Sequence, residues 1–364
     1  MEKQEFECLT LCPLDGRYSG VKDALGEYFS EYALVKYRVF VEIQWLKFLI
    51  ENVESDVLAK FDLQDMDKLT TISSEFNYDS FARIKEIENT TRHDVKAVEY
   101  FIDEKVDALG FGYLQSFVHI GCTSEDINNT SYACMLKYGL KDVWLPKAKE
   151  FAAIIDKWAE EHSNDAMLAH THGQPATPTT IGKEFTVYAY RFLSSIENVE
   201  AVKIKAKFNG ATGNYSAILT AFPNEDWQVL AKKFVEEYLG LTFNLLTTQI
   251  ESHDYTCHIL DGIRHFNNVL VDFDVDMWLY ISMEYFKQIP VKGEVGSSTM
   301  PHKVNPIRFE NSEANIDMSN NICIALSNKL PKSRMQRDLS ESSSQRNLGL
   351  AFGYSLQANN ETMN

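Results

Sequence analysis

The segment 293–306, GEVGSSTMPHKVNP, concentrates residue types that can do chemistry. Two glycines precede the adjacent serines Ser297 and Ser298, and His302 and Lys303 lie between two prolines. A serine hydroxyl can act as a base only when loop N–H donors and a nearby cation hold its alkoxide, and Lys303 could provide that cation. We interpret the segment as a reactive loop, with a solvated connection as the alternative.

A second segment, HTHGQPATPTTIGKE (170–184), carries His170 and His172 two positions apart. Such a pair can bind a metal ion, but no cluster with a third ligand accompanies it. A general acid or base is the better interpretation, since histidine titrates near neutral pH. A structural histidine is the alternative for either residue and the favoured interpretation for His170.

Two shorter loops also gather polar side chains. CTSEDINN (122–129) contains Thr123 and Ser124, which could cap a helix or present N–H groups to an anion. Read in isolation, it favours the cap. The segment NTTRHDVK (89–96) interrupts a helical pattern with three adjacent polar residues, Arg92, His93 and Asp94. Alone, this second loop is a weak signal, because charged turns are common.

The segment 329–346, KLPKSRMQRDLSESSSQR, carries an excess of positive charge in a chain of net charge −17. Serines 342–344 lie beside Arg346, an arrangement that suits phosphate or carboxylate binding. A solvated basic face is the alternative. Five basic residues stand against Asp338 and Glu341: Lys329, Lys332, Arg334, Arg337 and Arg346.

Composition narrows the class of protein. The chain has 364 residues, of which 45% are hydrophobic, which is enough for a large core and two or three domains. Its acidity disfavours nucleic acid and anionic membranes as partners, and an anionic ligand would need a local basic pocket. The six cysteines form no CxxC pair and indicate reduced thiols. No signal peptide and no apolar run of about 18 residues are present, which predicts a soluble, cytoplasmic protein without a membrane partner.

The elements that must position these loops are helices. We expect a helix over 31–50, a pair within 79–106 broken at 89–91, one from Thr123 towards Leu140, and one from Pro178 to about residue 208. The segment 254–289 is the clearest, with apolar residues alternating by four and three: Ile259, Ile263, Phe266, Leu270, Phe273, Met277 and Tyr280.

A helix over 254–289 would be roughly 50 Å long. It is apolar on more than one face, so it needs partners on several sides. We therefore predict an all-α fold with a long-helix bundle shared between subunits. One long amphipathic helix inside a monomer is the alternative.

Taken together, these loops resemble the fumarase/aspartase superfamily, whose members eliminate fumarate from a succinyl compound. GEVGSSTMPHKVNP resembles its signature loop, and the form with His302 is similar to that of the adenylosuccinate lyase family. Fumarases and aspartases carry a small residue at this position, and argininosuccinate lyases carry Gln followed by two lysines. The resemblance extends from residue 14 to about 353, through LDGRY (14–18), TTRHDVKAVEYF (90–101), CTSEDINN (122–129), THGQPATPTTIGKE (171–184), TTQIESHDY (247–255) and SRMQRDLSESSSQRN (333–347).

The resemblance implies an all-α subunit of three domains in a homotetramer, with a 20-helix tetramer core and active sites built from loops of three subunits. It implies an N-terminal helical domain over 1–112 and a central long-helix bundle domain over 113–364. It also implies a C-terminal third domain, which we expect this chain to lack, either as a fragment or as a naturally short protein. No metal or organic cofactor is implied.

Carried over residue by residue, the resemblance implies that Ser297 is the catalytic base, His172 the general acid and Glu310 the carboxylate that orients the acid histidine. A histidine as the base is the alternative. Lys303 and Asn305 resemble substrate contacts from the same loop. Further substrate contacts are implied for Arg17, Tyr18, Arg92, His93, Asp94, Thr123, Ser124 and Gln249. The rest of the phosphate and nucleotide site is implied for Arg337, Ser342 and Arg346.

The implied activity is that of a carbon-nitrogen lyase in purine biosynthesis. It would release fumarate by β-elimination from adenylosuccinate, giving AMP, and from SAICAR, the succinyl-aminoimidazole-carboxamide ribotide, giving AICAR. Ser344 and Gln345 depart from the family pattern, in which apolar residues are common there. The alternatives are another fumarate-releasing lyase, such as one acting on argininosuccinate, and a catalytically impaired, truncated oligomerisation scaffold.

Overall fold

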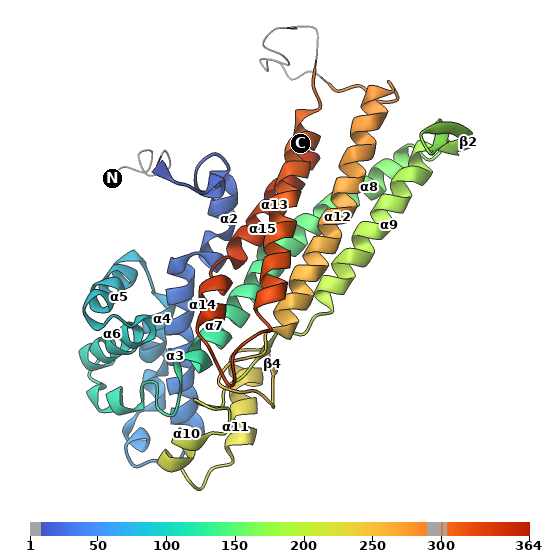
Figure 1. The fold of residues 1–364 in the computed structure, drawn as a ribbon. Helices are drawn as coiled ribbons and strands as arrows, with labels where there is room; N and C mark the ends of the chain where they lie inside the picture. The colour runs from blue at the N-terminus through green and yellow to red at the C-terminus, as the bar shows by residue number, and fades with distance from the viewer. Residues whose placement is uncertain (1–8, 290–299, 301–303) are drawn as a thin grey trace.

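The computed structural model describes residues 9–289, 300 and 304–364. Figure 1 shows an elongated, almost entirely helical molecule, so the predicted all-α class is confirmed. Helix α13 packs against α12 and α15, and α9 packs against α8 and α12. The bundle consists of α8 (Leu145–Glu161), α9 (Ile181–Glu200), α12 (Asp254–Ser282), α13 (Ile307–Lys329) and α15 (Leu348–Met363).

The N-terminal helices pack around α3 (Glu31–Asn52), which is buried along most of its length. Its bounds confirm the helix expected over 31–50. The other elements here are η1 (Pro13–Asp15), α2 (Ser19–Phe29), η2 (Leu58–Lys60), η3 (Leu63–Asp65), α4 (Met66–Ser74), α5 (Tyr78–Thr91), α6 (Asp94–Ala108) and η4 (Gly112–Phe117). The expected domain boundary at residue 112 falls at the start of η4. The boundary stays a prediction. Helix α3, which precedes it, packs against the next helix after η4, so these contacts cross residue 112.

That helix, α7 (Ser124–Gly139), is buried along nearly its whole length and continues through a π-helical turn, η5 (Leu140–Trp144), into α8. The cap predicted at Thr123 is confirmed, in the form of a capping box that Thr123 makes with Asp126. This reciprocal pairing satisfies two N–H groups that the first turn of a helix leaves open. The local sequence therefore sets where α7 begins.

Short elements close the end of the bundle near α7 (Figure 1). They are β3 (Lys205–Ala206), α10 (Ser216–Ala221), α11 (Trp227–Lys233), η6 (Phe234–Tyr238), β4 (Thr242–Phe243) and α14 (Ser340–Gln345), with β3 and β4 paired in parallel. An aromatic cluster fixes them to α3, with the ring centroids of Trp45 and Phe208 4.6 Å apart and those of Phe208 and Phe234 also 4.6 Å apart.

Helix α12 is shorter than the sequence pattern predicts. It ends at Ser282 after 29 residues, and not at 289, which makes it about 44 Å long. Glu284 has a φ of 62°, a left-handed conformation that a helix interior does not contain. The chain then turns so that Phe286 stacks on Phe185 of α9.

The expected helix start at Pro178 is wrong. Pro178 lies in a β-hairpin formed by β1 (Ala166–Thr171) and β2 (Gln174–Thr180), and α9 begins only at Ile181, capped by the Thr180 side chain. The helix also ends at Glu200, short of the expected residue 208. Prolines are tolerated in β2 because both strands of a two-stranded sheet are edges. Likewise, the break between α5 and α6 falls at residues 92–93 and not at 89–91.

None of the helices in the described part of the chain combines the length and apolar character needed to cross a membrane.

Candidate active site

The N-terminus of α7 is held by the carboxylate of Asp126, beside the predicted residues Thr123 and Ser124. Its Oδ2 accepts the Thr123 N–H at 2.8 Å, and its Oδ1 accepts the Asn209 N–H at 3.0 Å. Asn209 begins a glycine-rich segment, 209–213, that ends at Gly213. Gly213 has a φ of 78°, and a Cβ there would lie 2.3 Å from the Thr247 carbonyl oxygen. Only glycine therefore permits this close approach of 210–213 to the segment that carries Gln249.

Arg337 brings three of these segments together. Its Nη1 donates to Gln249 Oε1 at 3.2 Å, and its Nη2 donates to Glu125 Oε1 at 3.1 Å. Its Nε lies 3.5 Å from Glu341 Oε1. Burial raises the pKa of Glu341, the nearby charge of Glu125 adds to this, and Arg337 opposes it. Two predicted residues, Gln249 and Arg337, are thus in contact and are fixed by Glu125 and Glu341, which the sequence analysis did not assign to the site.

Arg346 and Asp94 form a second pair of predicted residues that meet. Arg346 Nη2 donates to Asp94 Oδ2 at 3.2 Å, although the two lie far apart in sequence. The same oxygen accepts from Arg38 Nη2 at 2.8 Å. Burial of Asp94 alone would raise its pKa, but the charge and hydrogen bond of Arg38 outweigh it, so the pKa of Asp94 lies below its ordinary value. Asp94 therefore stays ionised at neutral pH.

The loop before Asp94 exposes Arg92 and His93. Arg92 ends α5 with a φ of 55°, and His93 caps α6, its Nδ1 accepting the Lys96 N–H at 3.1 Å. Ser342 lies half-buried in α14 and donates its backbone N–H to the Leu339 carbonyl. Arg92 and His93 thus lie directly before Asp94 at the start of α6, and Ser342 follows Glu341 in α14.

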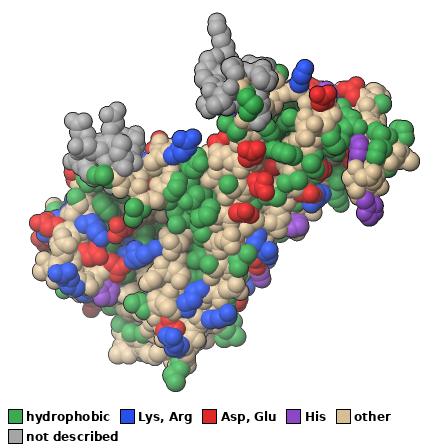
Figure 2. All heavy atoms as spheres, turned by 45° about the horizontal axis from the view of Figure 1, so that its top comes forward, with side chains coloured by type: hydrophobic (Ala, Val, Ile, Leu, Met, Phe, Trp, Pro, Cys, Tyr) green, Lys and Arg blue, Asp and Glu red, His purple; other side chains and the backbone are tan. Residues whose placement is uncertain are grey.

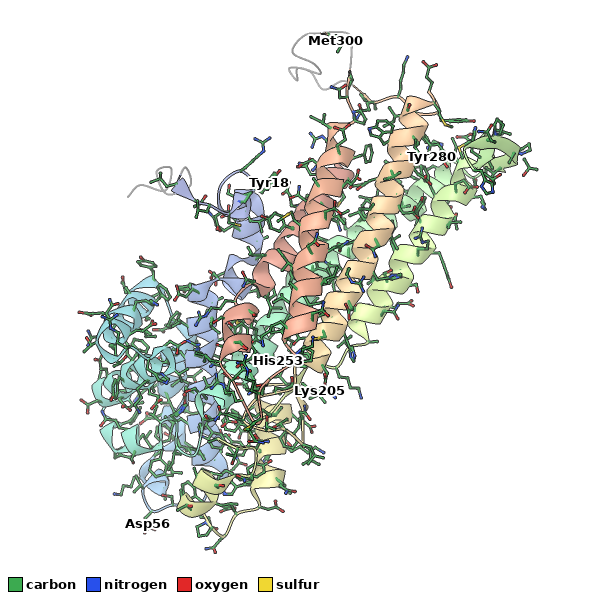
Figure 3. All side chains as sticks on the ribbon, in the orientation of Figure 1. Tyr18, Asp56, Lys205, His253, Tyr280 and Met300 are labelled. Atoms are coloured by element: carbon green, nitrogen blue, oxygen red, sulfur yellow. The ribbon has the colours of Figure 1, made fainter. Side chains whose placement is uncertain are left out.

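The first turn of α13 forms a second location, at the other end of the bundle. Trp278 Nε1 donates to Glu310 Oε1 at 3.2 Å, and Tyr18 OH donates to Asn311 Oδ1 at 3.1 Å. Figure 3 shows Tyr18 beside the bundle, with His253 at the far end of α12. Arg17 is exposed next to Tyr18, and Asn305 is half-buried before α13. The predicted residues Ser297 and Lys303 lie outside the described residues.

His172 occupies a third location, the tip of the β1–β2 hairpin. His172 and Gly173 have φ values of 54° and 70° between the paired residues Thr171 and Gln174, the signature of a two-residue type I′ turn. The His172 side chain is exposed, and the hairpin projects from the end of the bundle away from α14 (Figure 1). His170 instead lies with Nδ1 3.1 Å from the Leu168 carbonyl oxygen, which agrees with a structural role.

The predicted residues therefore fall in three places within one chain. The largest group, around the N-terminus of α7, also contains four residues that sequence reasoning missed: Arg38, Glu125, Asn128 and Glu341. The sequence held a signal for Arg38, because it is a charged residue within the apolar pattern of 31–50. Across residues 9–289, 300 and 304–364, no three His, Cys, Asp or Glu side chains are arranged to hold a metal ion.

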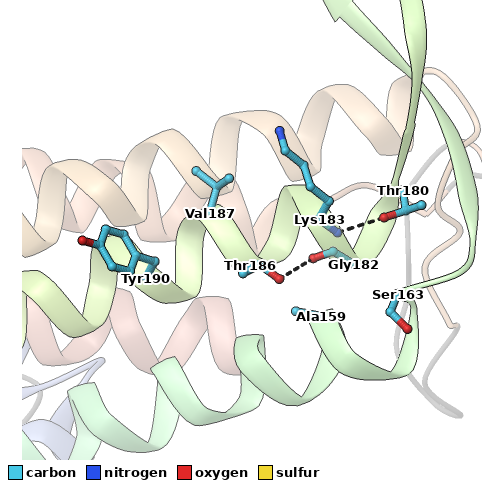
Figure 4. Close-up of a pocket in the computed structure, with 8 residues that line it drawn as sticks. All are labelled: Ala159, Ser163, Thr180, Gly182, Lys183, Thr186, Val187 and Tyr190. Carbon is cyan, nitrogen blue, oxygen red and sulfur yellow. Dashed lines mark hydrogen bonds between the residues drawn. The ribbon is translucent and has the colours of Figure 1, made fainter.

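A pocket of about 590 Å³ lies elsewhere, between α8 and α9 at the base of the hairpin (Figure 4). Gly182 brings the two helices together there, because a Cβ would lie 2.3 Å from the Ala159 carbonyl oxygen. None of the predicted site residues lines this pocket. Its walls are formed by Ala159, Ser163, Thr180, Gly182, Lys183, Thr186, Val187 and Tyr190.

Comparison with known proteins agrees with this fold. The crystal structure of a fumarate lyase from Mesorhizobium sp. BNC1 superposes with a TM-score of 0.72 at 16% identity, covering 94% of this chain and 74% of that one. The crystal structure of β-carboxy-cis,cis-muconate cycloisomerase from Acinetobacter calcoaceticus sp. ADP1 gives a TM-score of 0.67, also at 16% identity, covering 95% and 75%. At such identity these likenesses establish the fold alone.

Sequence similarity goes further. The family described as Lyase matches residues 16–320, and the chain belongs to that family. The chain is 47% identical over 361 residues to the adenylosuccinate lyase of Vibrio cholerae serotype O1, covering 99% of this chain and 79% of that protein. The adenylosuccinate lyase of Escherichia coli K12 is 46% identical over the same shares of the two chains. Within the lyase family, the chain groups with the adenylosuccinate lyases.

Proposed function

We propose that this protein eliminates fumarate from adenylosuccinate, giving AMP, and from SAICAR, giving AICAR. The observation that carries the proposal is the 47% identity to the Vibrio cholerae adenylosuccinate lyase over 99% of the chain. The loop SSTMPHKVNP, with His302, favours this activity over the splitting of argininosuccinate. Because both substrates are intracellular nucleotides, the proposal includes a cytoplasmic location.

The charges around α7 suit such a substrate, which carries a phosphate and two carboxylates. Arg337 pairs with Glu125 in the first turn of α7, where the helix dipole also favours an anion, and Arg346 of the same segment pairs with Asp94 at the start of α6. Thr123, Ser124, Ser342 and Gln249 lie at the same end and can donate hydrogen bonds to ligand oxygens. In a chain with a net charge of −17, Arg337 and Arg346 are the positive charges at this end that an anionic ligand would contact, and Glu125, Glu341 and Asp94 hold them in place.

Two proton transfers complete the reaction. A base must remove the weakly acidic proton on the carbon β to the leaving nitrogen, and an acid must protonate that nitrogen as it departs. We assign the base to Ser297, with Lys303 and loop N–H groups stabilising the alkoxide and the carbanion. We assign the acid to His172, whose imidazolium Glu310 would orient. Arg17, Tyr18, Arg92, His93, Asp94 and Asn305 would complete the substrate contacts.

The assignment requires more than one chain, because His172 and the α7 group lie at opposite ends of the subunit. We infer a homotetramer with shared active sites. Exposed apolar side chains along the bundle support it, and Figure 2 shows hydrophobic groups on this surface. On α9 and α12 they include Val187, Tyr190, Leu193, Val275, Trp278 and Leu279, with exposed fractions of 39–73%. The pocket of Figure 4, which contains Tyr190, belongs to this surface.

A direct assay tests the activity. The purified chain is incubated with adenylosuccinate, SAICAR and argininosuccinate in turn, and fumarate is measured by its ultraviolet absorbance. We expect release from the first two substrates and none from the third. Release from argininosuccinate alone would replace the proposed substrate, and no release from any of the three would reject the activity.

A further inference from the structure

A chain of hydrogen bonds joins Arg346 to Arg337 behind the ligand-facing side of the α7 group. Asp94 accepts from both Arg346 and Arg38. Arg38 Nε donates to Asn128 Oδ1 at 2.9 Å, and Asn128 Nδ2 donates to Glu125 Oε1, also at 2.9 Å. Glu125 then accepts from Arg337. We call Asp94, Arg38, Asn128 and Glu125 the relay.

The centre of the relay is out of reach of a ligand. Arg38, Asn128 and Glu125 are 2%, 7% and 3% exposed. An uncompensated guanidinium at such a depth would cost several kcal/mol, so its retention needs a partner on each side. Here Arg38 has Asp94 on one side and Asn128 on the other. The Asn128 amide can satisfy Arg38 and Glu125 together in one orientation only, which ties α3 to α7.

The charge of Arg38 also changes what Arg346 can do. Without Arg38, Asp94 would pair with Arg346 alone and compete with any anion for that guanidinium. Because Arg38 lies closer to Asp94, at 2.8 Å against 3.2 Å for Arg346, it takes up much of the carboxylate's charge. Arg346, which is 44% exposed at its side chain, then remains able to attract a ligand anion.

We propose that Arg38 and Asn128 are positioning residues that hold Arg346 and Arg337 in register for one anionic substrate, while touching neither the substrate nor the reacting atoms. The inference rests on the proposed function for the identity of the ligand. It adds that anion affinity depends on a buried arginine of α3 and a buried asparagine of α7, neither of which is among the proposed substrate contacts. A relay of purely structural value would affect stability without affecting ligand affinity.

The experiment measures binding of the two products, AMP and fumarate, by calorimetry in the full chain, with adenosine as the phosphate-free probe. Asn128→Leu removes both amide bonds, and Arg38→Lys keeps a charge beside Asp94 but loses the bond to Asn128. Each hydrogen bond concerned involves a charged group, so we expect the Kd of AMP or of fumarate to rise about tenfold or more in both variants. Adenosine binding should be unchanged, and kcat should fall much less than KM rises.

Asn267→Leu is the matched control. Asn267 is a fully buried asparagine of α12, bonded to Ser319 and Ser355, and its loss should lower Tm without changing product affinity. Should Asn128→Leu fail to fold, Arg38→Lys carries the test alone. Unchanged affinities for both AMP and fumarate in the folded variants, or no binding of either product to the parent chain, would overturn the proposal. A parent chain that binds AMP but releases no fumarate would reject the proposed activity and leave the relay measurable.

Discussion

Lys207 Nζ lies 2.8 Å from Asp126 Oδ1, and the two side chains are 0% and 1% exposed. Lys207 Nζ also donates to the Gly210 carbonyl at 3.0 Å. The pair therefore fixes the glycine-rich segment to the first turn of α7, where Thr123 begins the helix. Such a buried ion pair contributes more to the specificity of this arrangement than to net stability, because desolvation opposes the attraction.

Removing one partner of this pair leaves the other charge buried and unpaired. We expect Lys207→Met to lower the free energy of unfolding by about 3 to 5 kcal/mol, measured by urea denaturation at neutral pH. Lys68→Met is the control, because Lys68 pairs with Asp65 at the surface of α4 and should change stability by about 0.5 kcal/mol or less. Equal losses in the two variants would contradict the role assigned to Lys207.

Asp274 makes stability depend on pH in the acidic to neutral range. Burial raises its pKa from 3.8 to about 7, and its Oδ1 accepts from Thr362. The folded state thus binds the proton more tightly, so this stabilisation is complete below about pH 4 and is lost as pH rises through about 7.

We expect Asp274→Asn to exceed the parent in stability at pH 8 by about 2 to 4 kcal/mol, and this advantage to shrink towards pH 5. Thermal unfolding at four pH values measures it, and Asp156→Asn, at an exposed position of α8, serves as the control. An advantage that stays constant with pH would contradict the assignment.

His119 makes stability depend on pH in the alkaline range. Burial lowers its pKa, but Glu42, 2.6 Å from Nδ1, and Glu99 outweigh burial and raise the pKa from 6.5 to about 9. Its stabilisation is complete below about pH 6.5 and is lost as pH rises through about 9. We expect Glu42→Gln to be less stable than the parent by about 2 to 3 kcal/mol at pH 6.5, with the gap closing by pH 10. Urea titrations at the two pH values decide this, and a gap that widens with pH would exclude it.

The proposed shared site predicts complementation between inactive chains. Ser297→Ala and His172→Ala should each lower kcat by several orders of magnitude while keeping the parent Tm. When the two variants are denatured together and refolded as a mixture, some sites receive both native residues. We expect fumarate release to recover partly in that mixture and not in either variant refolded alone. A mixture as inactive as its components would place Ser297 and His172 in the same chain's site, or outside the mechanism.

The exposed bundle surface predicts the oligomeric state. Tyr190 is 73% exposed on α9. If a second chain covers this position, a glutamate in place of Tyr190 would bury a carboxylate without a partner. We expect the parent to have the mass of a tetramer by light scattering and Tyr190→Glu to have that of a smaller species at the same concentration. Tyr78→Glu, at a 74% exposed position of α5, should leave the mass unchanged. Identical masses for all three chains would remove α9 from the interface.

Local patterns predicted the elements that local forces decide. The capping box at Thr123 and the apolar stripe of α12 follow from adjacent residues, and the structure confirms both. The end of α12 was missed because the left-handed backbone of Glu284 leaves no signal in composition. The hairpin was missed because Pro178 suggested the start of a helix, although the two-residue turn at His172–Gly173 was a usable signal.

The candidate site shows the same division. The glycines, serines and basic residues of the loops stood out as residue types, but their grouping depends on contacts between distant segments. Asp94 and Arg346 are 252 positions apart, and no periodicity links them. Arg38 could have been found as a charge within an apolar helix, whereas the pairing of Asn128 with Glu125 becomes informative only once α3 packs against α7.

The projecting hairpin separates the folding of the chain from the completion of the proposed active site. A histidine carried on a two-residue turn at the tip of a protomer has its direction set by folding, but its place opposite a substrate would be set by the docking of another chain. Structure would then return after dilution from denaturant at a rate independent of protein concentration, while catalysis would return with the higher-order kinetics of assembly. Newly made chains would pass through a folded but idle stage whose duration depends on how many copies surround them.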